Sequence, residues 1–256
     1  MNRMLRTLLA GGFATAGLAI FTPSCSDNNS SLFITNVLYP TPPQCTITAD
    51  LTSPALPSGT LDLAFTQSYE ATLLVGNQLT SRGSKQTLRT ETSRVSLRGA
   101  EVTLNNSTGQ ELFKYSVNGT GFVDVSRGED SGLGLFAAEI IPASIGQQLT
   151  GLLAIPAGGS NQVVALIRVF GSTLGNQELT SAELSFPITI CTGCLIDYPL
   201  AAIIPTKPPT CARNSNELPV PGCRRGQDDF VDCRSCAGTQ DICLFVPVSE
   251  LPDGGM

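Results

Sequence analysis

The sequence predicts a mainly β protein: an antiparallel β-sandwich of the immunoglobulin-like kind, followed by a small disulfide-rich C-terminal segment. Three observations lead to this prediction. Apolar and polar residues alternate over short runs, turn-forming residues separate these runs, and most cysteines gather near the C-terminus. The 25 glycines and 17 prolines are typical of many short strands joined by turns.

The first residues are typical of an export signal. Arg3 and Arg6 precede an uncharged apolar run from Leu8 to Phe21. A positive start and a short apolar run indicate a signal peptide, since a helix that spans a membrane needs roughly 20 apolar residues. We therefore expect residues 1–24 to be a lipoprotein signal peptide.

Cys25 follows Thr22-Pro23-Ser24, which resembles a bacterial lipobox. Ser24 fits the small residue that precedes the acylated cysteine, whereas Thr22 and Pro23 depart from the usual Leu-Ala/Ser pattern. The pattern predicts diacylation of Cys25 and attachment to a membrane, with the polar residues 25–31 as a flexible tether. The alternative is ordinary cleavage nearby, which leaves Cys25 as a thiol or a disulfide partner.

Residues 32–190 are expected to form the sandwich. Strands with alternating or continuous apolar residues are expected over seven ranges: 61–65, 69–75, 95–104, 111–117, 133–141, 162–170 and 184–190. Gly99 is expected at a bulge or a crossing between sheets, and Pro187 at an edge or a bulge. Asn118-Gly119 is expected as a turn, and 143–149 as a helical turn.

The C-terminal part of the chain is rich in cysteine and proline and poor in apolar periodicity. We expect residues 191–245 to be a segment held by disulfides, with residues 246–256 as a disordered tail. Without Cys25 the nine cysteines leave an even number, which predicts four disulfides whose pairing the sequence leaves open. Cys45 is expected to attach the start of the domain to this segment. The disulfide candidates are Cys45, Cys191, Cys194, Cys211, Cys223, Cys233, Cys236 and Cys243.

Two Cys-x-x-Cys motifs, 191–194 and 233–236, carry further possibilities. Together they have the spacing of a four-cysteine zinc site, and either one alone has the spacing of a redox dithiol. An exported chain enters an oxidising compartment, which favours structural disulfides in both motifs. No metal or other cofactor is expected.

Acidic residues offer weaker candidates. The segment 226–232 contains three aspartates that could hold calcium, but it lacks the full calcium-loop pattern, and a solvated loop is the favoured interpretation. Glu129-Asp130 is expected in a turn. A hydrolase built from Asp and Glu would need two carboxylates at the right separation, which spacing in the sequence does not supply.

Absent residue types exclude several classes of protein. The chain has no His, which excludes Ser-His and Cys-His nucleophiles and zinc sites with imidazole ligands. None of its three lysines completes a Ser-x-x-Lys pattern, and no phosphate-binding loop is present. The net charge of −6 argues against nucleic acid and against electrostatic docking on anionic lipid.

Three stretches together resemble a known group of sequences: residues 98–104 (RGAEVTL), 169–195 (VFGSTLGNQELTSAELSFPITICTGCL) and 221–236 (PGCRRGQDDFVDCRSC). They are similar to uncharacterised lipoproteins encoded in myxobacteria-type genomes. In that family a β-domain ends in a Phe/Trp-Pro-Val/Ile strand followed by Cys-x-x-Cys-Leu, and a Gly-Gln-Asp segment precedes a later cysteine. The resemblance implies an exported lipoprotein with a disulfide-bonded C-terminus, and it implies no activity or catalytic residue.

The sequence therefore predicts a lipid-anchored protein of the bacterial cell envelope, at the outer membrane or otherwise periplasmic or secreted. We expect a structural or binding module and no enzyme, with an envelope protein or a polysaccharide as its partner. Two alternatives stay open: an envelope hydrolase that uses Asp and Glu, and a metal-binding or redox cysteine-rich module.

Overall fold

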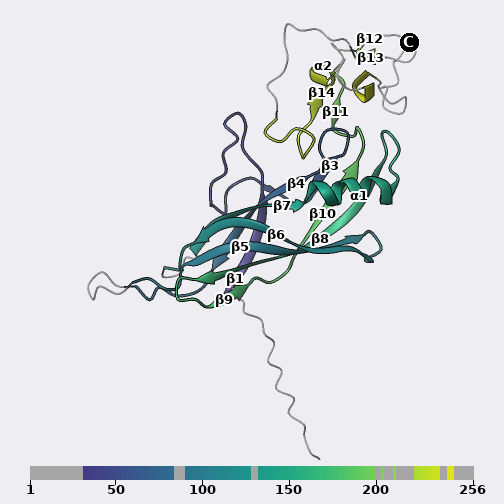
Figure 1. The fold of residues 1–256 in the computed structure, drawn as a ribbon. Helices are drawn as coiled ribbons and strands as arrows, with labels where there is room; N and C mark the ends of the chain where they lie inside the picture. The colour runs from purple at the N-terminus through teal and green to yellow at the C-terminus, as the bar shows by residue number, and fades with distance from the viewer. Residues whose placement is uncertain are drawn as a thin grey trace, which may run out of the picture.

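The computed structural model describes residues 31–83, 90–127, 132–199, 203–204, 210–211, 222–236 and 241–244. Ten strands form one large sheet in the order β2-β1-β4-β7-β6-β5-β8-β10-β3, with β9 paired to β8 (Figure 1). These strands are β1 (Leu32–Leu38), β2 (Ala55–Leu56), β3 (Gly59–Asp62), β4 (Tyr69–Asn77), β5 (Val95–Asn106), β6 (Glu111–Val123), β7 (Gly132–Ile141), β8 (Ser160–Thr173), β9 (Glu178–Thr180) and β10 (Leu184–Cys191).

The sheet is curled into a nearly closed, barrel-like form. Its pairs are antiparallel except for β10 and β3, which run parallel. The predicted mainly β class is confirmed, whereas the immunoglobulin-like sandwich is not: each long strand pairs onward into a single sheet, so no second sheet is needed to cover the core. Closing a sheet on itself also removes most of its exposed edges.

Alternation along the strands creates the core inside this sheet. In β8, the buried residues Val163, Ala165, Ile167 and Val169 alternate with more exposed ones, as period two requires. The same pattern in β5, β7 and β10 supplies further inward side chains, whereas β4 is buried at every residue from Ala71 to Asn77. The largest fully buried ones include Tyr69, Phe136, Leu73, Leu104 and Ile140.

Helix α1 (Ala143–Leu153) packs against this sheet and is longer than the single turn expected there. It begins after Pro142, whose backbone is extended and not helical, and ends at Ala154, whose backbone is in the left-handed region. Leu149 points into the core. Gly146 lets the helix lie against the loop after β3, where a Cβ would collide with the carbonyl oxygen of Gln67.

Three local expectations can be compared with the strands. Gly99 lies at a register shift in β5, so the predicted bulge is confirmed within one continuous sheet. Pro187 precedes the point at Ile188 where β3 begins to pair with β10, so one side of its strand is free there. The turn expected at Asn118-Gly119 is wrong, because both residues lie inside β6, where Gly119 leaves room for the ring of Phe136.

The remaining described elements follow β10 and are small. They are β11 (Ile196–Asp197), β12 (Ile203–Ile204), β13 (Thr210–Cys211), β14 (Val231–Asp232), α2 (Cys233–Cys236) and the 3-10 turn η2 (Asp241–Leu244). Figure 1 shows them gathered at one end of the sheet, while β1 begins at the opposite end. The sheet thus has a cysteine-rich end and an N-terminal end.

Candidate functional site

Four disulfides hold the cysteine-rich end together. They are Cys45–Cys223, Cys191–Cys194, Cys211–Cys233 and Cys236–Cys243. Disulfide bonds, which the sequence predicts, are therefore present, and Cys45 is joined to the C-terminal segment across 178 residues. We call the described residues 191–199, 210–211, 222–236 and 241–244 the cysteine cap.

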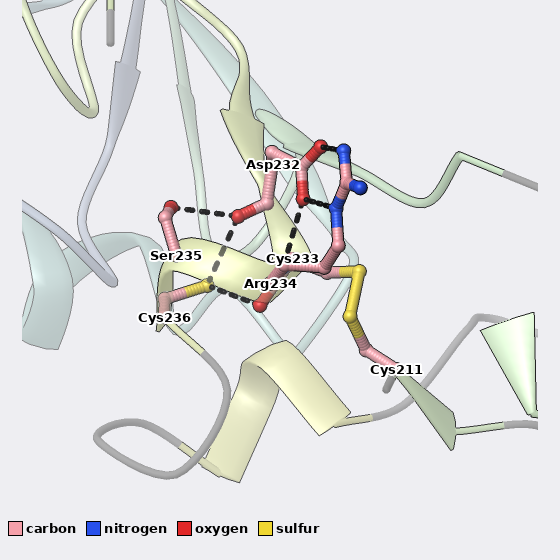
Figure 2. Close-up of polar contacts among 6 residues, drawn as sticks. All are labelled: Cys211, Asp232, Cys233, Arg234, Ser235 and Cys236. Carbon is pink, nitrogen blue, oxygen red and sulfur yellow. Dashed lines mark hydrogen bonds and ion pairs between the residues drawn. A yellow bond between two sulfur atoms is a disulfide. The ribbon is translucent and has the colours of Figure 1, made fainter. Parts of the chain in front are cut away.

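The two Cys-x-x-Cys motifs turn out to differ. Cys191 and Cys194 bond to each other, whereas Cys233 and Cys236 each bond to a cysteine outside their motif. Figure 2 shows the second motif on α2, with Cys233 bonded to Cys211. With these pairings neither motif presents the thiolates that a zinc site requires, and Cys233 and Cys236 do not form a dithiol pair with each other. The Cys191–Cys194 bond is the pairing that the oxidised form of a redox dithiol would have.

A bidentate ion pair fixes the start of α2 (Figure 2). Nη2 of Arg234 lies 2.7 Å from one carboxylate oxygen of Asp232, and Nε lies 2.9 Å from the other. The backbone N–H of Arg234 donates to the same carboxylate, as at a helix N-terminus. The hydrogen bonds from Arg234 hold the pKa of Asp232 below its ordinary value. This arrangement orients the helix that carries two of the disulfides.

Asp62, at the end of β3, organises the loop of the first motif. Its side chain is fully buried, and its oxygens accept the backbone N–H groups of Ala64 (3.0 Å), Gly193 (2.7 Å) and Leu195 (3.0 Å). A buried carboxylate is tolerated when several donors satisfy it. Asp62 therefore attaches the loop 191–195 to the end of the sheet.

Among the described residues, Asp62, Cys191 and Cys194 form the group whose ligand atoms come close enough to hold a metal ion. The sulfur atoms are joined in a disulfide, and both carboxylate oxygens already accept N–H groups. A metal would need thiolates and free carboxylate lone pairs. The chemistry of this group fits a structural anchor and does not fit a metal site.

Residues 224–229 (RRGQDD) close the gap between β3 and β4, and we call them the latch. The backbone N–H of Asp62 donates to the Gly226 carbonyl at 2.8 Å, and the N–H of Asp228 donates to the Thr60 carbonyl at 3.0 Å. Leu61 and Gln227 form an antiparallel bridge between these bonds. The latch thus acts as a very short extra strand on the free edge of β3.

Gln227 connects the latch to β4 through its side chain. The amide oxygen accepts the backbone N–H of Glu70 at 2.8 Å, and the amide NH₂ donates to the carbonyl of the same residue at 2.6 Å. The guanidinium of Arg224 also donates to this carbonyl and to Thr72 Oγ1. Because β1 ends at Leu38, opposite Thr72, the Glu70 backbone lacks a strand partner on that side. The Gln227 amide takes the place of one.

Two tyrosines complete the latch. Tyr69 donates its hydroxyl to Asp228 at 2.8 Å, and Tyr39 donates to Asp229. Burial, followed by the hydrogen bond to Asp229, raises the pKa of Tyr39 to about 12, and burial together with Asp228 raises the pKa of Tyr69. Both phenols therefore stay protonated and remain donors at neutral pH.

Burial also raises the pKa of the Asp228 carboxyl, although hydrogen bonds from the Thr60 N–H and the Tyr69 hydroxyl partly offset this. A carboxyl with a raised pKa is what the hydrolase alternative requires. Its oxygens, however, are bonded to groups within the protein, at 2.7 Å from the Thr60 nitrogen and 2.8 Å from the Tyr69 hydroxyl. Asp228 therefore stabilises the latch through both of its oxygens.

The solvated loop expected over 226–232 is wrong. Gln227 is 5% exposed and Asp229 is 7% exposed, because the Gln227 side chain bonds to β4 and the Asp229 carboxylate accepts the Tyr39 hydroxyl and the Arg224 N–H. Phe230, in contrast, is 71% exposed. The three aspartates of the same segment are the candidate calcium ligands. They are bonded to backbone N–H groups, to Tyr39 and Tyr69, and to Arg234.

Other candidates lie elsewhere. Cys25 and Glu129-Asp130 fall outside the described residues.

A pocket of about 70 Å³ opens at the N-terminal end of the sheet, lined by Leu79, Arg82, Thr92, Ser93, Thr173, Gly175 and Gln177. Beside it, the Glu91 carboxylate accepts the Ser81 hydroxyl and the N–H groups of Gly83 and Ser93. Within the part of the chain that the structure describes, no helix is long and apolar enough to cross a membrane.

Comparison of the chain with models of protein families, with curated proteins and with solved structures finds no match. The resemblance to lipoproteins of myxobacteria-type genomes thus stays a prediction.

Sequence reasoning missed the residues that build the latch. Asp62 gave a signal, because it is a carboxylate inside the apolar pattern of Leu61 and Leu63. Gln227 lies in the segment 226–232 that the sequence offered as a calcium candidate, but nothing in the sequence pointed to its bonds with β4, and the two tyrosines gave no signal.

Proposed function

We propose that this chain is a bacterial cell-envelope protein held at the outer membrane by acyl chains on Cys25. Its folded part acts as a structural or binding module. The export-type leader, the lipobox-like sequence before Cys25 and the polar residues after it all favour this function.

The pairing of the cysteines carries the proposal. Four disulfides use the eight cysteines from Cys45 to Cys243, and the ninth is Cys25. Acylation consumes the thiol of the cysteine that becomes the N-terminus. A disulfide-bonded lipoprotein is therefore expected to have an odd number of cysteines, with the odd one at the lipobox.

The cysteine cap supports the role of a binding module. Phe230 is 71% exposed, while its neighbours Asp229 and Val231 are buried and bonded within the cap. Leu51, in the loop that Cys45 joins to the cap, is 61% exposed. An aromatic side chain on a fixed loop loses little entropy on binding, so it suits contact with a polysaccharide or a protein of the envelope.

The mass of the N-terminal proteolytic peptide from host membranes tests the anchor. We expect a peptide that begins at Cys25 and carries a diacylglyceryl group, and we expect Cys25→Ser to move the protein into the soluble fraction. An unmodified N-terminus downstream of Phe21 would overturn the proposal and make Cys25, if retained, a ninth cysteine in need of a partner.

A further inference from the structure

Two apolar side chains are exposed on the outer face of the sheet at its N-terminal end. Phe122 on β6 and Leu174 after β8 are each 55% exposed. They flank Arg94, whose guanidinium lies 5.0 Å from the centre of the Phe122 ring. The N–H of Leu174 donates to the Arg94 carbonyl at 2.9 Å, and the side chain of Arg94 pairs with Asp124 at 3.1 Å. We call Arg94, Phe122, Asp124 and Leu174 the N-terminal rim.

Strand register places this rim beside the start of β1. Leu32, the first residue of β1, lies opposite Asn77 at the end of β4. The side chain of Asn77 donates to the Ser93 carbonyl at 3.0 Å, one residue before Arg94. Val95, one residue after Arg94, lies opposite both Val123 and Thr173. The rim and the point where the chain enters the sheet are therefore at the same end.

The cysteine cap lies at the other end of the same strands. β8 has 14 residues, with Thr173 opposite Val95 and Ser160 opposite Cys191. At a rise of about 3.3 Å per residue, this strand separates the two ends by about 45 Å.

The reach of the chain limits how the protein can sit on a membrane. Six residues lead from Cys25 to Ser31, the first described residue, and they span at most about 22 Å. An acylated Cys25 lies at the lipid surface, so the start of β1 stays within that distance. The near side of the cap is reached at Tyr39, which bonds to Asp229 about 23 Å along the strand from the start of β1. The rest of the cap lies beyond this point, so a cap that faced the lipid would hold the start of β1 beyond this reach.

We propose that the N-terminal rim rests on the lipid surface, with Phe122 and Leu174 in the interfacial layer and the cysteine cap directed away. This inference rests on the proposed lipid anchor. An aromatic ring, an aliphatic side chain and an arginine are the residue types that settle at the boundary between headgroups and acyl chains. Because the net charge is −6, apolar contact and not attraction to anionic lipid has to supply the interaction.

The chain itself allows a clean test, because it contains no Trp and because eight of its nine cysteines are in disulfides. Phe122→Trp introduces a single fluorescent reporter at the rim, and Phe230→Trp is the matched control on the exposed phenylalanine of the cap. The chain from Cys25 onward, which keeps every described residue, is coupled through the Cys25 thiol to a maleimide lipid in phosphatidylcholine vesicles.

Emission is then compared in vesicles with and without brominated acyl chains. We expect a blue shift and about a twofold loss of Trp emission for Phe122→Trp, and no change for Phe230→Trp. Leu174→Trp is a second rim reporter and should respond in the same way. A free-thiol count of one before coupling shows that each variant has formed its disulfides.

Three results would overturn the proposal: no response from either rim reporter, a response from Phe230→Trp alone, or equal responses at both ends. If the emission of neither rim reporter changes, the rim does not contact lipid and is available to a protein partner. Because the tether is supplied chemically, the test does not depend on natural acylation. The vesicle experiment therefore tests only the proposed orientation, whereas the mass of the N-terminal peptide tests the proposed anchor.

Discussion

Replacing Gln227 with Ala tests whether a side-chain amide stands in for a missing strand at the gap between β3 and β4. The substitution removes the acceptor of the Glu70 N–H and one of two donors to the Glu70 carbonyl. Arg224 still donates to that carbonyl, so one backbone group, the N–H, is left without a partner in a site where Gln227 is 5% exposed. A buried donor left unpaired costs about 1–3 kcal/mol, and the Glu70 N–H is part-buried, so we expect the free energy of unfolding to fall by about 1 kcal/mol.

The assay is urea unfolding followed by circular dichroism under non-reducing conditions, which keeps the disulfides intact. Gln162→Ala, at an exposed position on β8, is the matched control and should change the free energy by less than about 0.5 kcal/mol. Hydrogen exchange gives a local readout, because the Glu70 amide should lose protection in Gln227→Ala and keep it in the control. If both variants unfold alike and the Glu70 amide stays protected, the amide does not act as a strand partner.

Gln227→Glu refines the same test. The new carboxylate keeps an acceptor for the Glu70 N–H but places a second oxygen against the Glu70 carbonyl and the Asp228 carboxyl. We expect it to be more destabilising than Gln227→Ala at neutral pH and to recover as the pH falls and the carboxyl is protonated. A variant that is equally stable at both pH values would contradict this geometry.

Three further predictions concern other parts of the fold. Asp62→Ala should lower the free energy of unfolding by about 3 kcal/mol, because it leaves three N–H groups without an acceptor, one of them buried and two part-buried. The exposed Asp197→Asn should have little effect in the same urea assay. Glu91→Gln should destabilise the protein by on the order of 1 kcal/mol at neutral pH, allowing for solvent screening. Burial opposes ionisation of Glu91, but the hydrogen bonds from Ser81, Ser93, Gly83 and Arg82 outweigh it and lower the pKa of Glu91 from 4.5 to about 2. The difference in stability between the two proteins should therefore be full above pH 4.5 and vanish as the pH approaches 2. A difference that persists in acid would refute this prediction. Removing the Cys45–Cys223 disulfide by a double Ser substitution should lower the free energy of unfolding by up to about 5 kcal/mol, against about 2 kcal/mol for Cys236–Cys243. The reason is that the first disulfide closes a loop of 178 residues and the second a loop of 7. Calorimetry that ranks the two variants in the opposite order would contradict the loop-closure argument.

The strands could be predicted because their signal is local. In β10, Phe186, Ile188 and Ile190 are buried and alternate with more exposed residues, and a period of two reports a buried face without any knowledge of what covers it. The same signal could not separate a sandwich from a barrel-like sheet, since an inward face looks alike in both. The Asn118-Gly119 turn failed for a related reason. Gly119 is present because Phe136 packs against it, and nothing near it in the sequence reports that contact.

By itself the sequence determined the mainly β class and the presence of disulfides, because composition, cysteine count and alternation are properties of short stretches of chain. Only the tertiary structure decided which cysteines pair and how the sheet closes. The groups that close it are far apart along the chain: Gln227 meets Glu70 across 157 residues, and Asp62 meets Gly193 across 131. Such contacts form at strand ends that lack a partner, and these positions are defined only after the strands have assembled.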